Sequence, residues 1–268
     1  MSAISVLMPS YNAAAHVRAA VRSATSQLGP RDELVVQDAC STDGTAELLA
    51  EAAVADPRVR VRHERDSGQS QALNRGLDRA RGELVGWLNA DDLLLPGALA
   101  AVRAAVERLG HVPDVVVGGW RLLGASGAVI RAEPALPLAR GRLFTHGCYA
   151  FSGAVFVRRG LLRAIGGYAE HLHYTMDYDL MLRLVAAEPE QLVVEAPLAA
   201  LRYHDESKSG AAGRHFFTEA LSVRKGHCDS AGDLVRAAAG TLLHGVGVAT
   251  ARLRFSDTYS RLRLGRSL

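Results

Sequence analysis

The sequence of 268 residues contains little cysteine and almost no lysine. The cysteines restrict the possible classes of protein, whereas the scarcity of lysine reflects biased codon usage more than function. Its cysteines are Cys40, Cys148 and Cys228, which are too far apart for a zinc-ligand spacing. Three scattered cysteines also form no disulfide framework, which favours a reducing cytoplasm. The only lysines are Lys208 and Lys225, and the formal net charge of +3 is too small to indicate nucleic-acid binding.

Long hydrophobic runs are also missing. The longest uncharged stretch late in the chain, Ala237–Ala251, has 15 residues, whereas a helix that spans a bilayer needs roughly 20. Residues 1–8 do not combine a basic start with a long apolar core, so we expect no signal peptide. These absences predict a cytoplasmic protein.

Three nucleotide-binding motifs are absent as well. A dinucleotide-dependent dehydrogenase carries a Gly-X-Gly-X-X-Gly loop after its first strand, but residues 9–12 here read Pro-Ser-Tyr-Asn. The chain has no P-loop, and it lacks the Gly-rich loop bearing arginine or lysine with which sugar-1-phosphate nucleotidyltransferases begin. These three classes of enzyme are therefore excluded.

What the chain does contain is a pattern of strands alternating with helices. Hydrophobic residues make up 49% and charged residues 22%, which is typical of a soluble globular protein with a sizeable core. The expected strands are Ile4–Met8, Leu34–Gln37, Val59–His63 and Leu84–Leu88, and the expected helices between them are Ala14–Gln27, Thr45–Ala55 and Ser70–Ala80. This alternation predicts a doubly wound, mostly parallel α/β sheet.

Polar side chains follow each of these strands. Right-handed crossovers bring the carboxyl ends of parallel strands to one edge of the sheet, so we expect Asn12, Asp38, Asp66 and Asp91 to meet there. Ligands bind at this edge in open α/β sheets. The sequence therefore predicts a ligand site at the carboxyl edge.

From about Val112 the pattern changes to short strands and Gly-rich turns, which indicate an antiparallel or mixed extension of the sheet. Helices are expected at Arg159–Ile165 and Asp177–Ala187, with Asp179 and Arg183 paired at i,i+4. The expected strands are Val115–Val117, Trp120–Leu123, Val129–Arg131, Ala154–Val157, Leu192–Val194 and Ala199–Tyr203. The remainder of the chain reads as helical.

Asp91 and Asp92 follow the Leu84–Leu88 strand, and Pro96 is then expected in the first turn of a helix. Two adjacent carboxylates repel each other unless a cation or several donors hold them. A divalent ion bound jointly by carboxylate and substrate phosphate meets that need. The alternative to a metal site is that Asp91 and Asp92 only cap the N-terminus of the helix that follows.

Five segments resemble the family 2 glycosyltransferases, which are inverting, nucleotide-sugar-dependent enzymes of the GT-A fold. In order, they are Val6–Asn12, Val35–Thr45, Asp66–Gly76, Asn89–Asp92, and Gly166–Tyr168 together with Asp177–Arg183. The resemblance covers about Ile4 to Ser207. It implies a GT-A domain over residues 1–213, with a nucleotide-sugar half over about 1–112 and an acceptor half over about 113–213. Residues 214–268 would form a C-terminal helical extension.

This resemblance implies a nucleotide-diphosphate sugar donor, linked to UDP, GDP or dTDP. Pro9, Tyr11 and Asn12 would hold the base, and Asp38 would accept a hydrogen bond from its ring NH. The remaining donor contacts would come from Asp66, Gly68, Asn74, Asn89, Ala90 and Lys208. A plain turn or a helix cap is the alternative for the loop residues among them.

The resemblance also implies Mg²⁺ or Mn²⁺ bound by Asp91, with His204 completing the metal shell. Asn89 stands where the Asp-X-Asp motif of the family has its first aspartate, so the site has one negative charge fewer. A structural histidine is the alternative for His204.

Asp177 is the general base that the resemblance implies. It would take the proton from an acceptor hydroxyl as that oxygen attacks the anomeric carbon, a step that typically supplies about 10²–10⁴-fold. Met176 replaces an acid commonly found before the base. The alternative is that Asp177 only caps the helix that it begins.

The acceptor implied is a saccharide, a lipid-linked molecule or a metabolite. The C-terminal helices carry arginines among small apolar residues, which suits a peripheral contact with the inner face of an anionic membrane. A helical brace or a homodimer contact is the alternative. The alternative function for the whole chain is a catalytically silent module of the same fold that binds a nucleotide sugar or a glycan.

Overall fold

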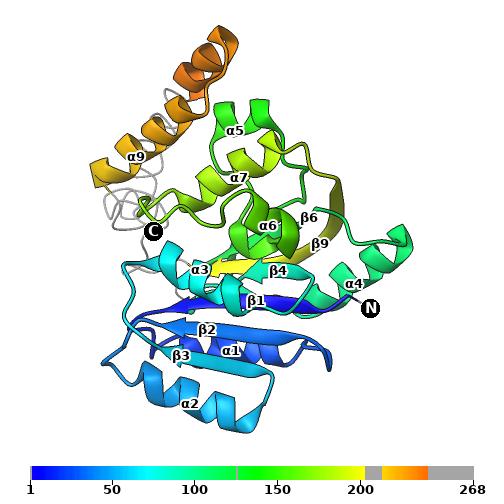
Figure 1. Cartoon of the computed structure of the whole chain (residues 1–268), viewed down its shortest axis with the longest axis vertical. Helices are drawn as coiled ribbons and strands as arrows, with labels where there is room; N and C mark the ends of the chain where they lie inside the picture. The colour runs from blue at the N-terminus through cyan, green and yellow to red at the C-terminus, as the bar shows by residue number, and fades with distance from the viewer. Residues whose placement is uncertain (1, 125, 203–212, 241–268) are drawn as a thin grey trace, which may run out of the picture.

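The structure is a computed structural model, and it describes residues 2–124, 126–202 and 213–240. The N-terminal part consists of strands that alternate with helices, as the sequence pattern predicts (Figure 1). The strands are β1 (Ile4–Ser10), β2 (Glu33–Asp38), β3 (Val59–His63) and β4 (Leu84–Trp87), and the helices are α1 (Val17–Thr25), α2 (Thr45–Ala55) and α3 (Gln69–Arg79).

These first four strands are parallel. β1 pairs with both β2 and β4, and β3 pairs with the outer side of β2. The register places Ser10 opposite Asp38 and Asp38 opposite His63. The carboxyl ends of the four strands therefore lie at one edge of the sheet, as the crossovers predict.

The rest of the described chain completes the sheet and adds helices. Its strands are β5 (Leu93–Leu94), β6 (Val115–Leu123), β7 (Val129–Glu133), β8 (Val155–Arg158) and β9 (Gln191–Arg202). Its helices are α4 (Ala98–Leu109), α5 (Arg140–His146), the 3₁₀ turn η1 (Ser152–Ala154), α6 (Arg159–Ala164), α7 (Met176–Ala186) and α9 (Gly213–Gly226), followed by a helix over 231–240.

The strand order is β3-β2-β1-β4-β8-β6-β9-β5, with β7 paired to β6 outside this path. β8 runs antiparallel to both β4 and β6, whereas β6 and β9 are parallel. A mostly parallel, doubly wound sheet with an antiparallel extension is the fold class that the sequence predicted. One sheet spans both expected halves, so the boundary near residue 112 stays a prediction.

Several predicted boundaries were wrong. β6 and β9 are each one strand, although each was expected as two, because register shifts absorb Gly119 and Pro197 without ending the pairing. α4 begins at Ala98 after Gly97 in the left-handed conformation, and Pro96 precedes it in a turn. β5 and α5 were not predicted, since each is short.

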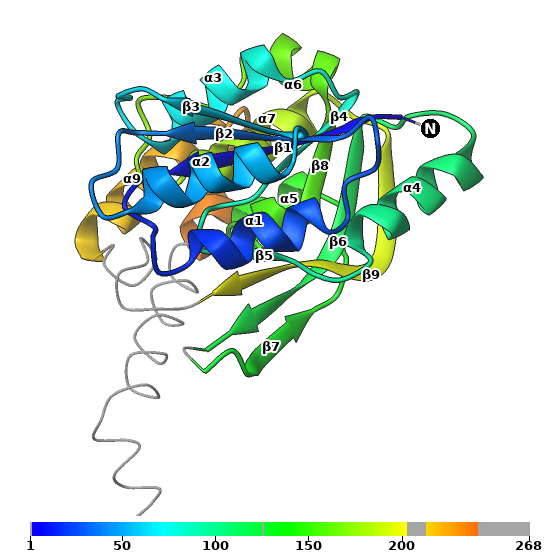
Figure 2. The same ribbon diagram turned by 90° about the horizontal axis from the view of Figure 1, so that it is seen from below.

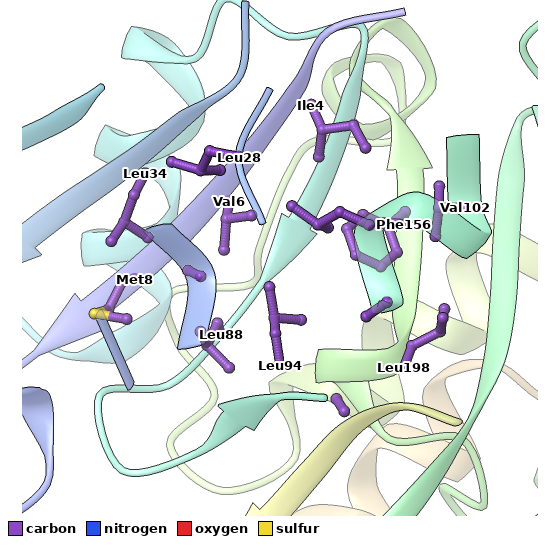
Figure 3. Packing of buried hydrophobic residues seen from close by; sticks show 14 of the residues in the cluster. Ile4, Val6, Met8, Leu28, Leu34, Leu88, Leu94, Val102, Phe156 and Leu198 are labelled. Atoms are coloured by element: carbon purple, nitrogen blue, oxygen red, sulfur yellow. The ribbon is translucent and has the colours of Figure 1, made fainter. Parts of the chain in front are cut away.

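Alternating side chains of β1 pack into two hydrophobic cores, one on each face of the sheet. Val6 and Met8 pack with residues of α1, α2 and α4, whereas Leu7 packs with residues of α3, α5, α6 and α7. Figure 2 shows helices on both faces of the sheet. Figure 3 shows Val6, Met8, Leu88 and Phe156 within the first of these cores.

Gly86 explains how β8 approaches β4 so closely. A Cβ atom at Gly86 would lie 2.5 Å from the Phe156 ring, so only glycine leaves room for this buried aromatic side chain. Within the described residues, no helix is long and apolar enough to cross a membrane.

Candidate functional site

The loops after β1 and β2 are tied together at the carboxyl edge of the sheet. Asn12 donates from its backbone N to the Ser41 Oγ at 2.8 Å, and its Oδ1 accepts from the Thr42 N at 3.0 Å. Asn12 and Cys40 have φ angles of 46° and 61°, a left-handed conformation that is uncommon outside glycine. Such strain concentrates at ligand-binding loops.

Two of the residues predicted to hold the base lie in different environments. Tyr11 is 65% exposed at the rim, as a stacking surface requires. Pro9 is buried within β1, opposite Gln37 of β2. Any contribution of Pro9 to a ligand therefore comes through the shape of the strand end, and the roles of both residues stay predictions.

Asp38 is fully buried at the end of β2. Its Oδ1 accepts from the Ser41 Oγ at 2.6 Å and its Oδ2 from the Ser41 N at 2.9 Å, and the His63 Nδ1 lies 3.2 Å from the same Oδ2. Asp38 thus holds the Ser41 turn, which in turn holds Asn12. A direct hydrogen bond to a nucleobase requires movement of that turn, and this role stays a prediction.

The loop after β3 contains a buried carboxylate oxygen with no hydrogen-bond partner in the described part of the chain. The Oδ1 of Asp66 accepts from the Gly68 N at 3.1 Å, whereas its buried Oδ2 has no hydrogen-bond partner among the described residues. Burial raises the pKa of this carboxyl, and the charges of Asp38 and Glu64 raise it further. Buried polar atoms without partners are rare, so this oxygen is a candidate contact for a bound polar molecule.

Sequence reasoning missed two more such atoms. The Oγ atoms of Ser10, at the end of β1, and Ser70, in the first turn of α3, are also buried without a hydrogen-bond partner in the described part of the chain. Their positions beside Tyr11 and Gly68 were the available signal. Together with Asp66, they leave unfilled hydrogen-bonding capacity at the strand ends.

Gly68 begins α3 with φ 139° and ψ −179°, a conformation that is essentially restricted to glycine. It contributes no side-chain cap, and α3 has no acidic residue in its first turn. The N–H groups of that turn are therefore suited to an anion.

Asn74 lies further along α3 and has a structural contact. Its Nδ2 donates to the Tyr168 O and the Glu170 Oε1, both at 2.9 Å, and its Oδ1 accepts from the Tyr168 N at 2.8 Å. The side-chain amide thus holds the loop that leads to α7. The geometry gives no support to its predicted contact with ribose or diphosphate.

Asn89 connects the loops after β3 and β4. Its Oδ1 accepts from the Gln69 Nε2 and the Trp87 Nε1, both at 2.7 Å, and its Nδ2 donates to the Asp92 Oδ2 at 2.8 Å. All of these contacts suit an amide, whereas a carboxylate at position 89 has no N–H to donate to Asp92. The departure from the family motif therefore has a structural reason.

Asp92 is the buried member of the aspartate pair. Besides Asn89, its Oδ1 accepts from the Arg202 N at 2.9 Å, which joins the β4 loop to the end of β9. Burial and the neighbouring charge of Asp91 raise the pKa of Asp92 to about 8. Asp91 is half-buried, so of the two aspartates it is the one with access to solvent. Ala90, between Asn89 and Asp91, is buried.

The described residues contain no group of three or more His, Cys, Asp and Glu side chains that could hold a metal ion. His204 and Lys208, predicted at the metal and at the donor, lie outside the described residues. A protein-only metal cage is therefore not formed by the part of the chain that the structure describes. Asp91 remains the candidate ligand for a cation shared with substrate oxygens.

Asp177 lies in the first turn of α7, where its Oδ1 accepts from the Tyr178 N at 2.7 Å. Burial raises the pKa of the Asp177 carboxyl, and the charge of Glu219 also raises it; hydrogen bonds from Tyr178 and the Cys148 thiol offset only part of this. A raised pKa strengthens a carboxylate as a proton acceptor. The contact with Cys148 was not foreseen from the sequence.

The helix that carries Asp177 is anchored to the sheet. The expected ion pair is confirmed, because the Arg183 Nε lies 2.7 Å from the Asp179 Oδ2. Arg183 also donates to the Gly167 O at 2.8 Å, and the Tyr168 ring meets Trp87 of β4 edge to face at 5.5 Å. These contacts connect α7 to β4, the strand that leads into the loop with Asn89 and Asp91.

Comparison with solved structures supports the fold. The chain superposes on Staphylococcus aureus TarS 1-349 in complex with UDP-GlcNAc with a TM-score of 0.69, at 19% identity over 97% of this chain and 75% of that one. The mannosyltransferase PcManGT from Pyrobaculum calidifontis, in complex with GDP-Man and Mn²⁺, gives a TM-score of 0.62, at 19% identity over 98% and 78%. The fold is that of the GT-A glycosyltransferases.

Sequence comparison then gives the family. The family model described as glycosyl transferase family 2 matches residues 5–165, more than half of the chain, and the chain belongs to this family. An uncharacterized glycosyltransferase of Rickettsia felis is 28% identical over 79% of this chain and 36% of its own length. The succinoglycan biosynthesis protein ExoO of Rhizobium meliloti is 30% identical over 57% and 43%. The chain spans about a third of the length of the Rickettsia relative.

Proposed function

We propose that this chain binds a nucleoside-diphosphate sugar and transfers its sugar, with inversion, to a hydroxyl group of a saccharide, lipid-linked or metabolite acceptor. The observation that carries the proposal is the set of buried polar atoms without partners at the carboxyl edge, from Ser10, Asp66 and Ser70. A polar ligand would satisfy them. The structural relatives whose complexes contain UDP-GlcNAc or GDP-Man support a nucleotide sugar as that ligand.

The donor would lie across the ends of β1 to β4. Tyr11 offers an exposed ring to the base, and the open first turn of α3 offers N–H groups to the diphosphate. Asp66 would accept hydrogen bonds from ribose hydroxyls through its unpartnered Oδ2. The donors that fit this chemistry are linked to UDP, GDP or dTDP.

Asp91 fits a hard divalent cation such as Mg²⁺ or Mn²⁺. Such a cation prefers oxygen ligands and is often bound by one or two carboxylates together with substrate phosphates. When bound, it would supply charge neutralisation on the departing diphosphate. Asn89 would fix the loop through Gln69 and Asp92, so that the Asp91 carboxylate is held at the edge.

Asp177 would remove the proton from the acceptor hydroxyl. That oxygen forms a bond to the anomeric carbon as the bond from this carbon to the diphosphate oxygen breaks on the opposite face. The proton passes to the Asp177 carboxylate, and the electron pair leaves with the nucleoside diphosphate. The half-buried position and raised pKa of Asp177 support this role.

The acceptor class is supported by the relatives rather than by a pocket. The relative ExoO is named as a succinoglycan biosynthesis protein, and this favours a saccharide acceptor for the present chain. The membrane and homodimer contacts expected of the C-terminal extension concern residues largely outside the described part of the chain, and both stay predictions.

The test measures nucleoside diphosphate released from UDP-GlcNAc and GDP-mannose by the full chain with Mn²⁺. We expect release by the wild-type protein and a loss of about 10²–10⁴-fold in Asp177→Asn, with binding of the nucleoside diphosphate retained. Equal release by the variant contradicts the role of Asp177. Binding without release by the wild-type protein favours the silent binding module instead.

A further inference from the structure

The helix α9 packs against α7, the helix that bears Asp177 (Figure 1). α9 lies beyond residues 5–165, which match the family model. Its contacts fall on residues immediately before and after Asp177. The last segments of the described chain therefore bear on the catalytic half of the site.

Glu219 of α9 makes the densest of these contacts. Its Oε1 accepts from the Tyr174 N and the Thr175 N, both at 2.7 Å, and from the Thr175 Oγ1 at 2.9 Å, while its Oε2 accepts from the His173 N at 3.0 Å. These four hydrogen bonds fix three consecutive residues. Burial opposes the charge of Glu219, but the hydrogen bonds prevail and lower its pKa.

Glu219 holds the backbone just before α7, a helix without a side-chain cap of its own. Thr175 is the N-cap residue of α7 and makes no side-chain hydrogen bond to the first turn; its backbone N and its hydroxyl both donate to Glu219. A negative charge near the N-terminus of a helix is favourable for the helix dipole. Asp177 stands two residues after this N-cap, so the position of its carboxylate depends on the fixed turn.

Two further contacts hold the same part of α7. The Arg224 Nε donates to the Tyr178 hydroxyl at 3.0 Å, and the His227 Nε2 lies 2.9 Å from the Asp179 Oδ1. Arg224 is only 4% exposed, so this attachment is part of the packed interior. Residues 219 to 227 thus hold α7 on both sides of Asp177.

We propose that Glu219 is a positioning residue for the general base, fixing the 173–175 turn so that the Asp177 carboxylate stands where the acceptor hydroxyl arrives. This inference rests on the proposed function of Asp177. The groups that face Asp177 from other elements are Glu219 and the Cys148 thiol. On its own helix, Asp179 is paired with Arg183 and His227.

Amide hydrogen exchange over residues 171–178 of the full-length chain tests the contact itself. Glu219→Ala removes all four acceptor contacts, so exchange at His173, Tyr174 and Thr175 is expected to accelerate by about tenfold or more. Glu107→Ala is the matched control, because Glu107 is an exposed helical glutamate of α4. Unchanged exchange in Glu219→Ala overturns the proposal.

Glu219→Gln then tests positioning with little change in shape. The variant loses the negative charge. Its NH₂ group replaces one of the two carboxylate oxygens, and this group cannot accept a hydrogen bond from a backbone N–H. We expect kcat for nucleoside diphosphate release from UDP-GlcNAc or GDP-mannose to fall about 10- to 100-fold, with KM for the donor within about twofold. The acid limb of the kcat profile should also move to lower pH, since the charge that raises the pKa of Asp177 is gone.

A purely structural role for Glu219 lowers the unfolding temperature but leaves kcat of the folded protein and its acid limb unchanged, and that result overturns the proposal. Failure of the underlying function is distinguishable from this. If Asp177→Asn releases nucleoside diphosphate at the wild-type rate, the base assignment fails, whatever Glu219 does. If Asp177→Asn is inactive and Glu219→Gln is normal, only the positioning role fails.

Discussion

The Nδ2 of Asn89 donates to the Oδ2 of Asp92 at 2.8 Å, which sets an amide against a carboxylate that is 1% exposed. The two residues flank Asp91 in the loop after β4. The Asn89 amide donates a hydrogen bond to the buried Asp92 side chain and carries no charge. An aspartate at position 89 would instead add a third acidic side chain beside Asp91 and Asp92. The departure at position 89 from the family pattern thus fits the surrounding structure.

Asn89→Asp should destabilise the chain without metal. The variant removes the N–H donor to Asp92 and adds a negative charge close to Asp91, so a loss of about 1–3 kcal/mol in the free energy of unfolding is expected at pH 7 in EDTA. Mn²⁺ should restore part of the loss by offsetting the added charge. Thermal unfolding with EDTA and with Mn²⁺ checks this, and an unfolding temperature in the variant that does not respond to Mn²⁺ argues against a cation at Asp91.

Asp92 should make stability fall as pH rises. Its pKa is about 8 in the folded chain, and an unfolded aspartate has a pKa of about 3.9. Between these values the native chain binds a proton that the unfolded chain has released, so the free energy of unfolding decreases by at most about 1.4 kcal/mol per pH unit. Stability from this group is complete below about pH 4 and is lost as pH passes through about 8.

Asp92→Asn should flatten this dependence. Urea unfolding at pH 5 and pH 7.5 in EDTA measures the difference in stability between the two conditions for both proteins. The variant is expected to be weaker at both pH values, because its NH₂ group faces one of the two former donors. The test therefore compares how much stability each protein loses between pH 5 and pH 7.5. An equal loss in both proteins contradicts the protonation of Asp92.

Gly68→Ala should weaken both the fold and donor binding. A side chain at φ 139° is strained even though nothing lies within 4 Å of the added Cβ, so a cost of about 1–3 kcal/mol is expected. The same strain displaces the first turn of α3 from the diphosphate. Gly141→Ala in α5 is the control, since that position also has open space and no left-handed φ, and it should be neutral or slightly stabilising.

Cys148→Ala should shift the pH dependence of turnover. Burial raises the pKa of Asp177 above its ordinary value, and the nearby Cys148 thiol, whose Sγ lies 3.4 Å from the Ala150 O, lowers it in part. Without the thiol, the base requires a higher pH to lose its proton, so the acid limb of kcat should move upward. A kcat profile that stays in place, with normal unfolding behaviour, contradicts the contact between Cys148 and the base.

The parallel half of the fold could be predicted because its signals are local. Apolar runs end at Gly, Pro or polar residues, and each run from β1 to β4 appears as a strand within one or two residues of its expected limits. Right-handed crossovers then fix the shared edge. In the second half, Gly118, Gly119 and Pro197 interrupt the apolar pattern, but pairing with neighbouring strands continues through them. Tertiary pairing therefore overrides the local signal.

The candidate site was predictable only in part, for the same reason. Residue type and position after a strand pointed to Asp38, Asp66 and Asp91, whereas burial decides what each can do. Asp38 is fully buried, and the Asn74 amide is hydrogen-bonded to the Tyr168 backbone. Both facts depend on segments that are distant in the sequence. Glu219 binds the residues just before α7 across a sequence separation of more than forty residues, which no local pattern reveals.

The central claim is that the carboxyl edge of the sheet binds a nucleoside diphosphate together with a divalent cation. Isothermal titration of the full chain with UDP, GDP and dTDP, each with Mn²⁺ and with EDTA, tests it most directly. We predict one site per chain for at least one nucleotide, strongly weakened by EDTA and by Asp91→Asn. No heat of binding for any of the three nucleotides in the presence of Mn²⁺ would contradict the account.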